Sequence, residues 1–217
     1  MLNINSYKSI LFDLDNTLYA DGKGPINEVE ERMNDYFIKK LGFSPKEAND
    51  KRLYFHYRYG STVNGLKEEC NFSLSQIIDF LEYSHNVNIT NYLKPDKRLN
   101  ELLSKIKPQK FIVTNSYKNY AIKVLEQLGI LEYFSFVFDV IEMNFLSKSS
   151  AQCFYNILSK INSKPEETIF IDDAPEYLQY SKAAKIFTIK ISHRKNNYNF
   201  TPDLELDNIY ELEKYIF

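Results

Sequence analysis

The stretch Ser9–Leu18, which reads SILFDLDNTL, decides the fold of this chain. Its apolar run Ile10–Phe12 has the length and residue types of a buried strand, and two carboxylates follow it, Asp13 and Asp15. Residues two apart in a strand point to the same side, so these charges repel unless a cation or a shared proton lies between them. A divalent metal ion is the simplest solution, and a solvated turn is the alternative.

The composition limits the classes of protein that need to be considered. The chain has 217 residues, of which 44% are hydrophobic and 26% charged, as expected for one globular domain with an insertion or for two small domains. The 27 basic and 29 acidic residues give a formal charge of −2, so nothing indicates binding to a nucleic acid polymer or to an anionic membrane.

The cysteines and the apolar runs predict where the protein works. Cys70 and Cys153 show no metal-ligand spacing, and we expect both to be reduced thiols. The segment Met1–Ser6 has no signal-peptide pattern, and no apolar run approaches the length that crosses a bilayer. We therefore expect a soluble cytoplasmic protein with no membrane partner.

The segment after Thr17 has helical periodicity as far as about Leu93. Gly60 and Gly65 interrupt the pattern, and the segment contains no convincing strand. Three helices are expected, the first followed by a glycine cap at Gly42 and the second preceded by the capping box SPKE: Ile26–Leu41, Pro45 to about Tyr59, and Ser73–Tyr83.

From Leu93 onward strands and helices alternate, which predicts right-handed crossovers and a parallel sheet covered on both faces. The expected strands are 111–113, 136–143, 168–171 and 186–191, and the expected helices are 97–107, 117–128, 151–161, 177–184 and 208–216. The predicted fold class is therefore α/β, a Rossmann-like doubly wound sheet with a helical subdomain, residues 21–93, inserted after the first strand. Residues 1–20 and 94–217 form the predicted core.

Polar residues follow three of the predicted strands directly. Asp13 and Asp15 follow the first, Thr114 and Asn115 the second, and Asp172 and Asp173 the fourth. Parallel sheets bind ligands outside the carboxyl ends of their strands, so we expect these side chains to meet in one site.

These motifs resemble, in order, those of the haloacid-dehalogenase superfamily, most of whose members are Mg²⁺-dependent phosphatases. The resemblance implies that Asp13 is the nucleophile that forms an aspartyl-phosphate and that Asp15 is the general acid/base. It implies a Mg²⁺ site made by the Asp13 carboxylate, the Asp15 backbone carbonyl and Asp172, with Asp173 as a further ligand or as the group that orients a metal-bound water. A carboxylate is an adequate nucleophile towards a metal-neutralised phosphoryl group.

The resemblance also assigns the residues that hold the phosphate. Thr114 and Asn115 would bind it, with a helix N-cap as the alternative role. Lys148, the only basic residue between Lys123 and Lys160, stands where the family places a phosphate-neutralising lysine. The family usually has proline after this lysine, where this chain has Ser149. The second departure is Lys185, which stands where relatives commonly have glycine. This position is structural and does not affect the predicted chemistry.

Asp15 argues for phosphoryl transfer rather than dehalogenation, because dehalogenases have no acid at this position. Three stretches resemble the pyrimidine 5'-nucleotidases of this superfamily: Tyr57–Leu66, Leu93–Asp96 and Thr114–Ala121. That resemblance implies nucleoside 5'-monophosphates such as UMP and CMP as substrates. Candidate specificity residues are Tyr57, Tyr59, Asn64 and Asn119, with packing of the tyrosines as the alternative. A sugar-phosphate phosphatase or phosphomutase and a non-catalytic phosphate-binding module are the alternative functions.

Overall fold

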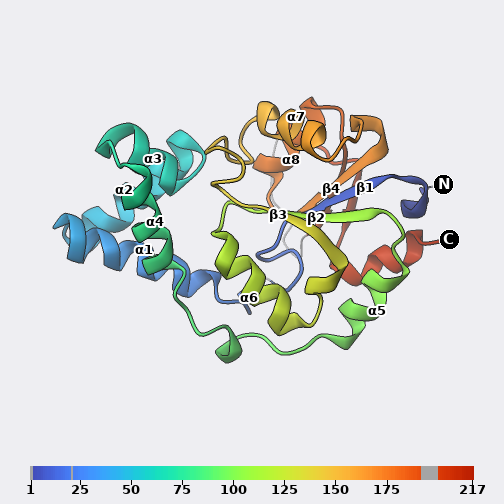
Figure 1. Cartoon of the computed structure of the whole chain (residues 1–217), viewed down its shortest axis with the longest axis horizontal. Coiled ribbons are helices and arrows are strands. Elements are labelled where there is room, and N and C mark those ends of the chain that lie inside the picture. The colour runs from blue at the N-terminus through green and yellow to red at the C-terminus, as the bar shows by residue number, and fades with distance from the viewer. Residues whose placement is uncertain (1, 21, 192–199) are drawn as a thin grey trace.

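The computed structural model describes residues 2–20, 22–191 and 200–217. Within these ranges six strands form one parallel sheet in the order β3-β2-β1-β4-β5-β6 (Figure 1). The strands are β1 Ser9–Phe12, β2 Gln109–Val113, β3 Phe134–Phe138, β4 Thr168–Asp172, β5 Phe187–Ile191 and β6 Leu204–Leu206. The chain builds the sheet outward from β1 in one direction and then from β4 in the other. The point between β1 and β4 is therefore the topological switch point, where doubly wound sheets bind ligands.

Alternate residues of the strands face two separate apolar clusters. Ile10 and Phe12 of β1 point into one cluster, whereas Leu11 points into the other. Helices α5 Lys97–Lys105 and α6 Lys118–Leu128 cover the first face, and α7 Ala151–Lys160 and α8 Pro175–Ala183 cover the second (Figure 1). The predicted parallel sheet with helices on both faces is confirmed.

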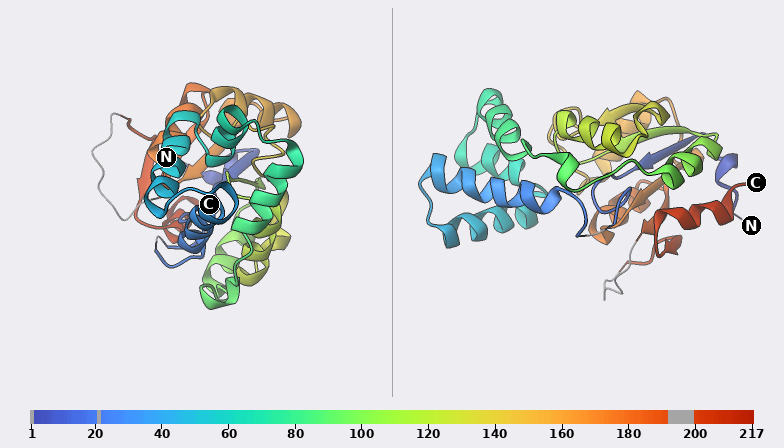
Figure 2. Two further views of the ribbon diagram at one scale, coloured as in Figure 1. Left: turned by 90° about the vertical axis from the view of Figure 1, so that its left-hand side faces the viewer. Right: turned by 90° about the horizontal axis from the view of Figure 1, so that it is seen from below.

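The helices between β1 and β2 form a separate unit, which we call the cap. It consists of α1 Ile26–Leu41, α2 Pro45–Tyr59, α3 Thr62–Cys70 and α4 Leu74–Ser84, and it lies beside the sheet rather than over either face (Figures 1 and 2). Phe37, Phe55 and Phe80 are fully buried in its own apolar cluster. The predicted helical insertion after the first strand is thus present.

The expected limits of the cap, 21 and 93, stay a prediction. Asp21 lies outside the described residues. Val87, Ile89 and Leu93 pack into the cluster beneath the sheet and not into that of the cap. On packing alone, we propose that the cap ends near Ser84.

Local sequence sets the ends of the cap helices. The Ser44 and Ser73 side chains each accept a hydrogen bond from the backbone of the third helical residue, Glu47 or Gln76, whose own side chain returns the contact. Gly42 and Gly60 end α1 and α2 in the left-handed region, both with φ of 77°.

Two sequence predictions in this part of the chain were wrong. Gly65 does not interrupt a helix but lies inside α3, and a Cβ there would come within 2.0 Å of Cγ of Phe55. Close packing of α3 on α2 therefore selects glycine. The third strand ends at Phe138 rather than Met143, because the Asp139 carboxylate accepts the backbone N–H groups of Ile141 and Glu142 and folds the chain into a turn.

Two differences occur near the C-terminus. The strand β6 is too short, at three residues, for its alternation to be recognised in the sequence. The closing helix is a 3₁₀ helix, Ile209–Tyr215, rather than an α-helix. The remaining short 3₁₀ helices are Ile4–Ser6, Ile89–Asn91, Leu131–Tyr133 and Pro165–Glu167. Among the described residues, no helix combines the length and apolar character needed to cross a membrane.

Helix α8 ends in a Schellman motif with a lysine in the position that normally belongs to glycine. The Ile186 N–H donates to the Ser181 carbonyl at 3.1 Å and the Lys185 N–H to the Lys182 carbonyl at 2.9 Å, which places Lys185 at φ 64°. A side chain with a Cβ is strained in this conformation.

Replacing Lys185 with glycine should stabilise the protein. We expect Lys185→Gly to raise the free energy of unfolding in urea by about 1 kcal/mol, because relief of the left-handed strain exceeds the added entropy of the unfolded chain. The control is Ala184→Gly, at the preceding residue with φ of −80°, which relieves no strain and should be destabilising. Destabilisation by both variants would contradict the strain at Lys185.

Candidate active site

Strand register brings the predicted site residues together at one edge of the sheet. Phe12 pairs with Ile112 on one side and with Ile171 on the other. The residues that follow, Asp13 and Asp172, are therefore neighbours, and the Asp13 N–H donates to the Ile171 carbonyl at 2.8 Å. This edge is the switch point between β1 and β4.

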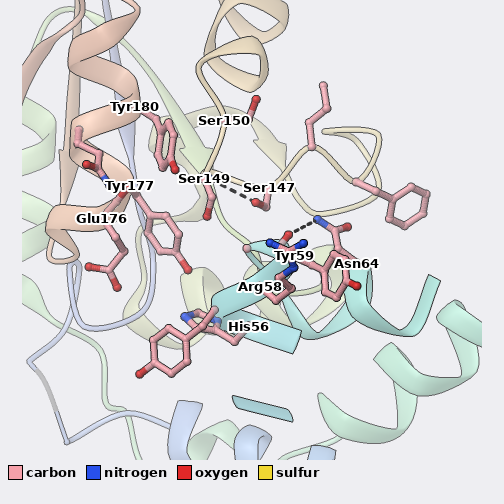
Figure 3. Close-up of a pocket in the computed structure, with 15 residues that line it drawn as sticks. His56, Arg58, Tyr59, Asn64, Ser147, Ser149, Ser150, Glu176, Tyr177 and Tyr180 are labelled. Atoms are coloured by element: carbon pink, nitrogen blue, oxygen red, sulfur yellow. Dashed lines mark hydrogen bonds between the residues drawn. The ribbon is translucent and has the colours of Figure 1, made fainter. Parts of the chain in front are cut away.

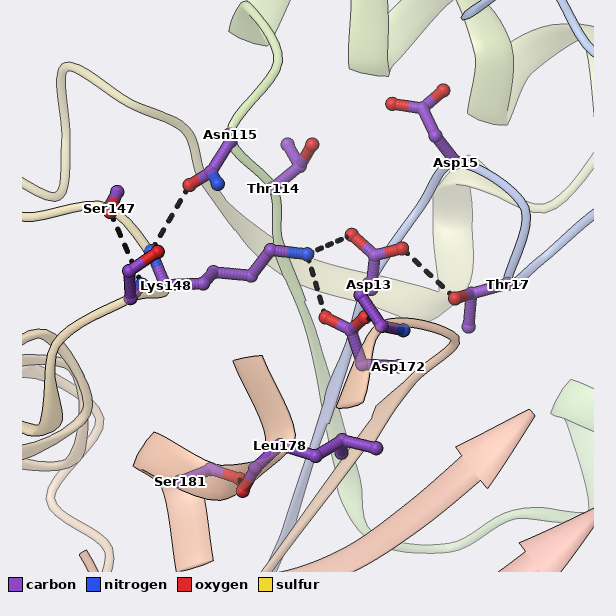
Figure 4. Close-up of polar contacts among 12 residues, drawn as sticks. Asp13, Asp15, Thr17, Thr114, Asn115, Ser147, Lys148, Asp172, Leu178 and Ser181 are labelled. Carbon is purple, nitrogen blue, oxygen red and sulfur yellow. Dashed lines mark hydrogen bonds and ion pairs between the residues drawn. The ribbon is translucent and has the colours of Figure 1, made fainter. Parts of the chain in front are cut away.

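A buried lysine joins two of the carboxylates. Nζ of Lys148 lies 2.5 Å from Oδ1 of Asp13 and 2.7 Å from Oδ2 of Asp172 (Figure 4). Burial by itself lowers the pKa of Lys148, but attraction to Asp13 and Asp172 outweighs it and raises this pKa above its ordinary value. The second Asp13 oxygen, Oδ2, accepts a hydrogen bond from Thr17 Oγ1 at 2.9 Å. Both oxygens of the proposed nucleophile are therefore held in fixed directions.

Three carboxylates form a cluster that suits a divalent cation. Oxygens of Asp13, Asp172 and Asp173 lie within 4.8 Å of one another. Burial raises the pKa of Asp172 to about 7 against the opposing effect of Lys148, and burial with repulsion from Asp172 and Asp13 raises the pKa of Asp173 to about 9. The three carboxylates exceed the charge of the one ammonium, and a hard cation with oxygen ligands would neutralise the excess. The donor set fits Mg²⁺.

The Asp15 side chain is held apart from this cluster. Its carboxylate accepts hydrogen bonds from Ser116 Oγ at 2.8 Å, from the Tyr120 hydroxyl at 2.7 Å and from the Tyr19 hydroxyl. Figure 4 shows it separate from the contacts between Asp13 and Lys148. Burial and then the charge of Asp13 raise its pKa, against the effect of the three hydroxyls. A raised pKa suits a group that must hold a proton near neutral pH.

Thr114 and Asn115 both make hydrogen bonds within the protein, and their binding of phosphate stays a prediction. The Thr114 N–H donates to the Phe138 carbonyl within the sheet, and the Thr114 hydroxyl oxygen accepts the Ser116 N–H at 3.0 Å. The Asn115 side-chain oxygen accepts the Lys148 N–H at 3.2 Å, so Asn115 positions the backbone of the lysine. Among the described residues, Nδ2 of Asn115 is buried and has no hydrogen-bond partner.

Two cavities adjoin at this edge of the sheet. The smaller, of about 300 Å³, contains Asp13, Asp15, Thr114 and Lys148. The larger, of about 670 Å³, lies between the cap and the core and is lined by Tyr57, Tyr59 and Asn64, three of the predicted specificity residues (Figure 3). The residues that line both are His56, Glu176 and Tyr177.

The fourth candidate, Asn119, is exposed on α6 and lines neither cavity. Tyr59 is only partly available, since its ring packs in the cap cluster and its hydroxyl donates to Glu69 at 2.9 Å. Tyr57 is the more accessible ring, with 79% of its surface exposed.

Several residues around the site were missed in the sequence. Four of them lie in or next to the sequence motifs and donate hydrogen bonds to Asp13 or Asp15, the predicted catalytic carboxylates. Their position close to these motifs could have indicated them: Thr17, Tyr19, Ser116 and Tyr120. The cap contributes Glu30, Arg52 and His56 to the smaller cavity. Arg52 and His56 are one helical turn apart on α2, but only the docking of the cap shows that this face points to Asp13.

Comparison with known proteins identifies the family. Residues 7–184 match the family model described as haloacid dehalogenase-like hydrolase. The chain belongs to this family. The predicted superfamily is thereby confirmed, and the protein is a hydrolase by family membership. The pyrimidine nucleotidase branch stays a hypothesis.

Individual relatives of this hydrolase share parts of its sequence or its fold. It is 34% identical to Phosphate metabolism protein 8 of Saccharomyces cerevisiae over 138 residues, which cover 58% of this chain and 41% of the yeast protein. The match thus spans about two fifths of that relative's length. CbbY from Rhodobacter sphaeroides, solved in complex with phosphate, superposes with a TM-score of 0.65 at 17% identity, covering 95% of this chain and 96% of CbbY.

A 2-haloacid dehalogenase from Pseudomonas syringae is also similar, with a TM-score of 0.62 at 17% identity, covering 96% of this chain and 97% of the dehalogenase. A protein solved with phosphate and a dehalogenase therefore share this fold. The reaction of this chain has to be inferred from its own side chains.

Mg²⁺ should stabilise this hydrolase more at high pH than at low pH. Aspartates in an unfolded chain have a pKa of about 4. Folded Asp172 and Asp173, with pKa values of about 7 and about 9, keep protons that the unfolded chain has lost, so the stability of the metal-free protein falls as pH rises through this range. Bound Mg²⁺ replaces those protons. We expect the Mg²⁺-induced rise in Tm, measured by calorimetry, to be larger at about pH 8.5 than at about pH 6.5.

The variant Asp173→Asn tests whether these carboxyl groups cause the pH dependence of the Mg²⁺-induced rise in Tm. Removing one carboxylate from the cluster should reduce both the Mg²⁺-induced rise in Tm and its dependence on pH. An equal rise in Tm at both pH values in the unaltered protein would contradict the titration of these carboxyl groups.

Proposed function

We propose that this hydrolase is a Mg²⁺-dependent phosphomonoesterase that acts through an aspartyl-phosphate on Asp13. The observation that carries the proposal is the Lys148 ammonium held between Asp13 and Asp172, next to a third carboxylate in the same cluster. This arrangement offers an oriented nucleophile and compensates the negative charge of a phosphoryl group.

In the first step an oxygen of Asp13 attacks phosphorus, the bond from phosphorus to the leaving oxygen breaks, and Asp15 gives that oxygen a proton. In the second step Asp15 takes a proton from water, whose oxygen attacks phosphorus and releases Asp13 as a carboxylate. Lys148 and the Thr114 hydroxyl would bind the phosphoryl oxygens.

Asp13, Asp172 and Asp173, with the Asp15 backbone carbonyl, would hold Mg²⁺, which when bound supplies charge neutralisation for the nucleophile and the phosphoryl group. Within the first step the raised pKa of Asp15 matches its part as acid, because a protonated carboxyl must be available near neutral pH.

The substrate that we propose is a nucleoside 5'-monophosphate, with pyrimidines such as UMP and CMP preferred. Support comes from the larger cavity, which adjoins the catalytic one and contains tyrosine rings with amide and hydroxyl groups. A flat base can stack on such rings while polar groups contact its edge. The yeast relative is named for phosphate metabolism, and CbbY was solved with phosphate, which supports the coarser assignment to small phosphate esters. A sugar phosphate is the alternative substrate.

The roles of the two aspartates can be separated by leaving group. We expect Asp13→Asn to lower kcat for UMP and for p-nitrophenyl phosphate alike by more than about 10³-fold, because it removes the nucleophile. Asp15→Asn should lower kcat by about 10²-fold or more for UMP but much less for p-nitrophenyl phosphate, whose leaving group needs no proton. Steady-state phosphate release with Mg²⁺ measures both effects.

Asp203→Asn is a matched control, because the Asp203 carboxylate accepts a hydrogen bond from the backbone N–H of Thr188 in β5 and lines neither cavity. Its phosphate release should stay near that of the unaltered protein, and EDTA should stop release by every variant. Full activity of Asp13→Asn would disprove the aspartyl-phosphate.

The substrate class can be tested at the rim of the larger cavity. We expect Tyr57→Ala to raise KM for UMP and CMP about tenfold, as loss of one stacking contact implies, and to leave KM for p-nitrophenyl phosphate nearly unchanged. Tyr54→Ala is the control, since Tyr54 is also exposed on α2 but lines neither cavity. Phosphate release from sugar phosphates but not from nucleotides would support the proposed mechanism and contradict the proposed nucleotide substrate.

A further inference from the structure

The catalytic lysine stands on a loop that packs against two separate clusters. We call residues 139–150, between β3 and α7, the lysine loop. Met143 and Leu146 of this loop pack into the cluster on the sheet, whereas Val140 is fully buried in the cap cluster and Ile141 and Phe145 pack against it. The loop extends from the sheet to the cap helices (Figure 1). Much of its apolar surface is therefore buried only when the cap is seated.

The end of α2 meets this loop at the lysine itself. A Cβ on Gly60 would lie 2.5 Å from Oγ of Ser147, 2.7 Å from Oγ of Ser149 and 2.8 Å from Cβ of Ser149. These two serines flank Lys148 in the sequence, and Figure 3 shows them above the end of α2 that carries Tyr59. No side chain fits between the cap and the lysine loop at this point.

The loop backbone is held by its own hydrogen bonds, from the Asn144 N–H to the Ile141 carbonyl at 2.8 Å and from the Phe145 N–H to the Val140 carbonyl at 3.0 Å, and the cap adds a contact to Phe145. Asn144 and Phe145 have φ of 53° and 63°, a conformation that is unfavourable for a bulky residue such as phenylalanine. Strain of this kind persists only where the surroundings hold it. Here the Phe145 ring packs on the cap cluster, with Nζ of Lys67 from α3 4.8 Å from its centre.

We infer that the cap positions Lys148: contact of Gly60 with Ser147 and Ser149, burial of Val140 in the cap cluster and packing of Phe145 against that cluster together hold the lysine loop so that the ammonium reaches Asp13. Gly60 is a positioning residue in this scheme. From the core side, Asn115 and the two aspartates fix the backbone and the ammonium of the same lysine. Seating of the cap and assembly of the catalytic cluster are thus one event. The activity readout of this inference rests on the proposed phosphatase function.

The test compares two glycines with the same φ and similar ψ. Gly42 and Gly60 both end a cap helix at φ 77°, with ψ of 16° and −9°, but a Cβ on Gly42 would have no atom within 4 Å among the described residues. Gly42→Ala and Gly60→Ala therefore introduce similar backbone strain, and only Gly60→Ala forces the cap and the lysine loop apart. Hydrogen exchange of amides 144–150, measured by mass spectrometry, reports the loop without requiring activity. The rate of phosphate release from p-nitrophenyl phosphate reports whether Lys148 is correctly placed in the site.

We expect Gly60→Ala to speed exchange in 144–150 and to lower kcat for p-nitrophenyl phosphate about tenfold or more, as displacement of a catalytic group implies. Gly42→Ala should leave the exchange rate of 144–150 and the kcat for p-nitrophenyl phosphate within about twofold of those of the unaltered protein, since its backbone strain is similar but distant from the site. Adding Ser147→Ala and Ser149→Gly to Gly60→Ala removes the colliding atoms and should restore most of the lost rate.

Equal behaviour of Gly60→Ala and Gly42→Ala would overturn the inference. So would a higher KM for UMP with unchanged kcat for p-nitrophenyl phosphate, because Gly60 would then shape only the substrate cavity. If the unaltered protein releases no phosphate, the proposed function fails, and faster exchange of 144–150 in Gly60→Ala alone still supports the positioning of the loop.

Discussion

The buried ammonium of Lys148 between Asp13 and Asp172 is the interaction on which the site depends. Burying one lysine and several carboxylates is unfavourable unless the opposite charges lie close together and their remaining hydrogen bonds are made. Here the distances are 2.5 and 2.7 Å, Thr17 satisfies the second Asp13 oxygen, and Asn115 holds the lysine backbone. Even so, the three carboxylates outnumber the one ammonium, and burial raises the pKa of Asp172 and of Asp173. A site built in this way is completed by a cation or by a phosphate that arrives with one.

The architecture separates the groups proposed to react from those proposed to select the substrate. The proposed nucleophile, the proposed metal ligands and the hydroxyl partners of Asp15 stand at the carboxyl ends of strands, in the turns that follow them or, for Tyr120, in the first turn of α6. The larger cavity is lined instead by cap residues and by the rim of the core, with His56, Glu176 and Tyr177 shared between the two cavities. A leaving group that enters the larger cavity would therefore pass these three side chains.

The lysine loop connects these two parts of the molecule. It belongs to the core by sequence, but Val140 is buried in the cap cluster, and Ile141 and Phe145 pack against that cluster. A lysine carried on such a loop makes the geometry of the catalytic cluster sensitive to the position of helices that contribute no reacting group. This arrangement gives the proposed enzyme a physical means of joining closure over the substrate to the alignment of its charges.

The sheet, the helical insertion and most of the charged cluster could be predicted from the sequence. Short apolar runs followed by polar residues are local signals, and parallel strands necessarily bring their carboxyl ends to one edge, so Asp13, Thr114 and Asp172 could be expected to meet. Lys148 follows no strand directly, and only the resemblance to the family indicated its place in the site. Caps at Ser44 and Gly42 marked helix ends for the same local reason. The packing of the folded chain, in contrast, puts Gly65 within a helix against Phe55, brings Ser116 and Tyr120 to the Asp15 carboxylate, and turns Arg52 towards the smaller cavity. These features depend on contacts between segments far apart in the chain, which periodicity and spacing do not encode.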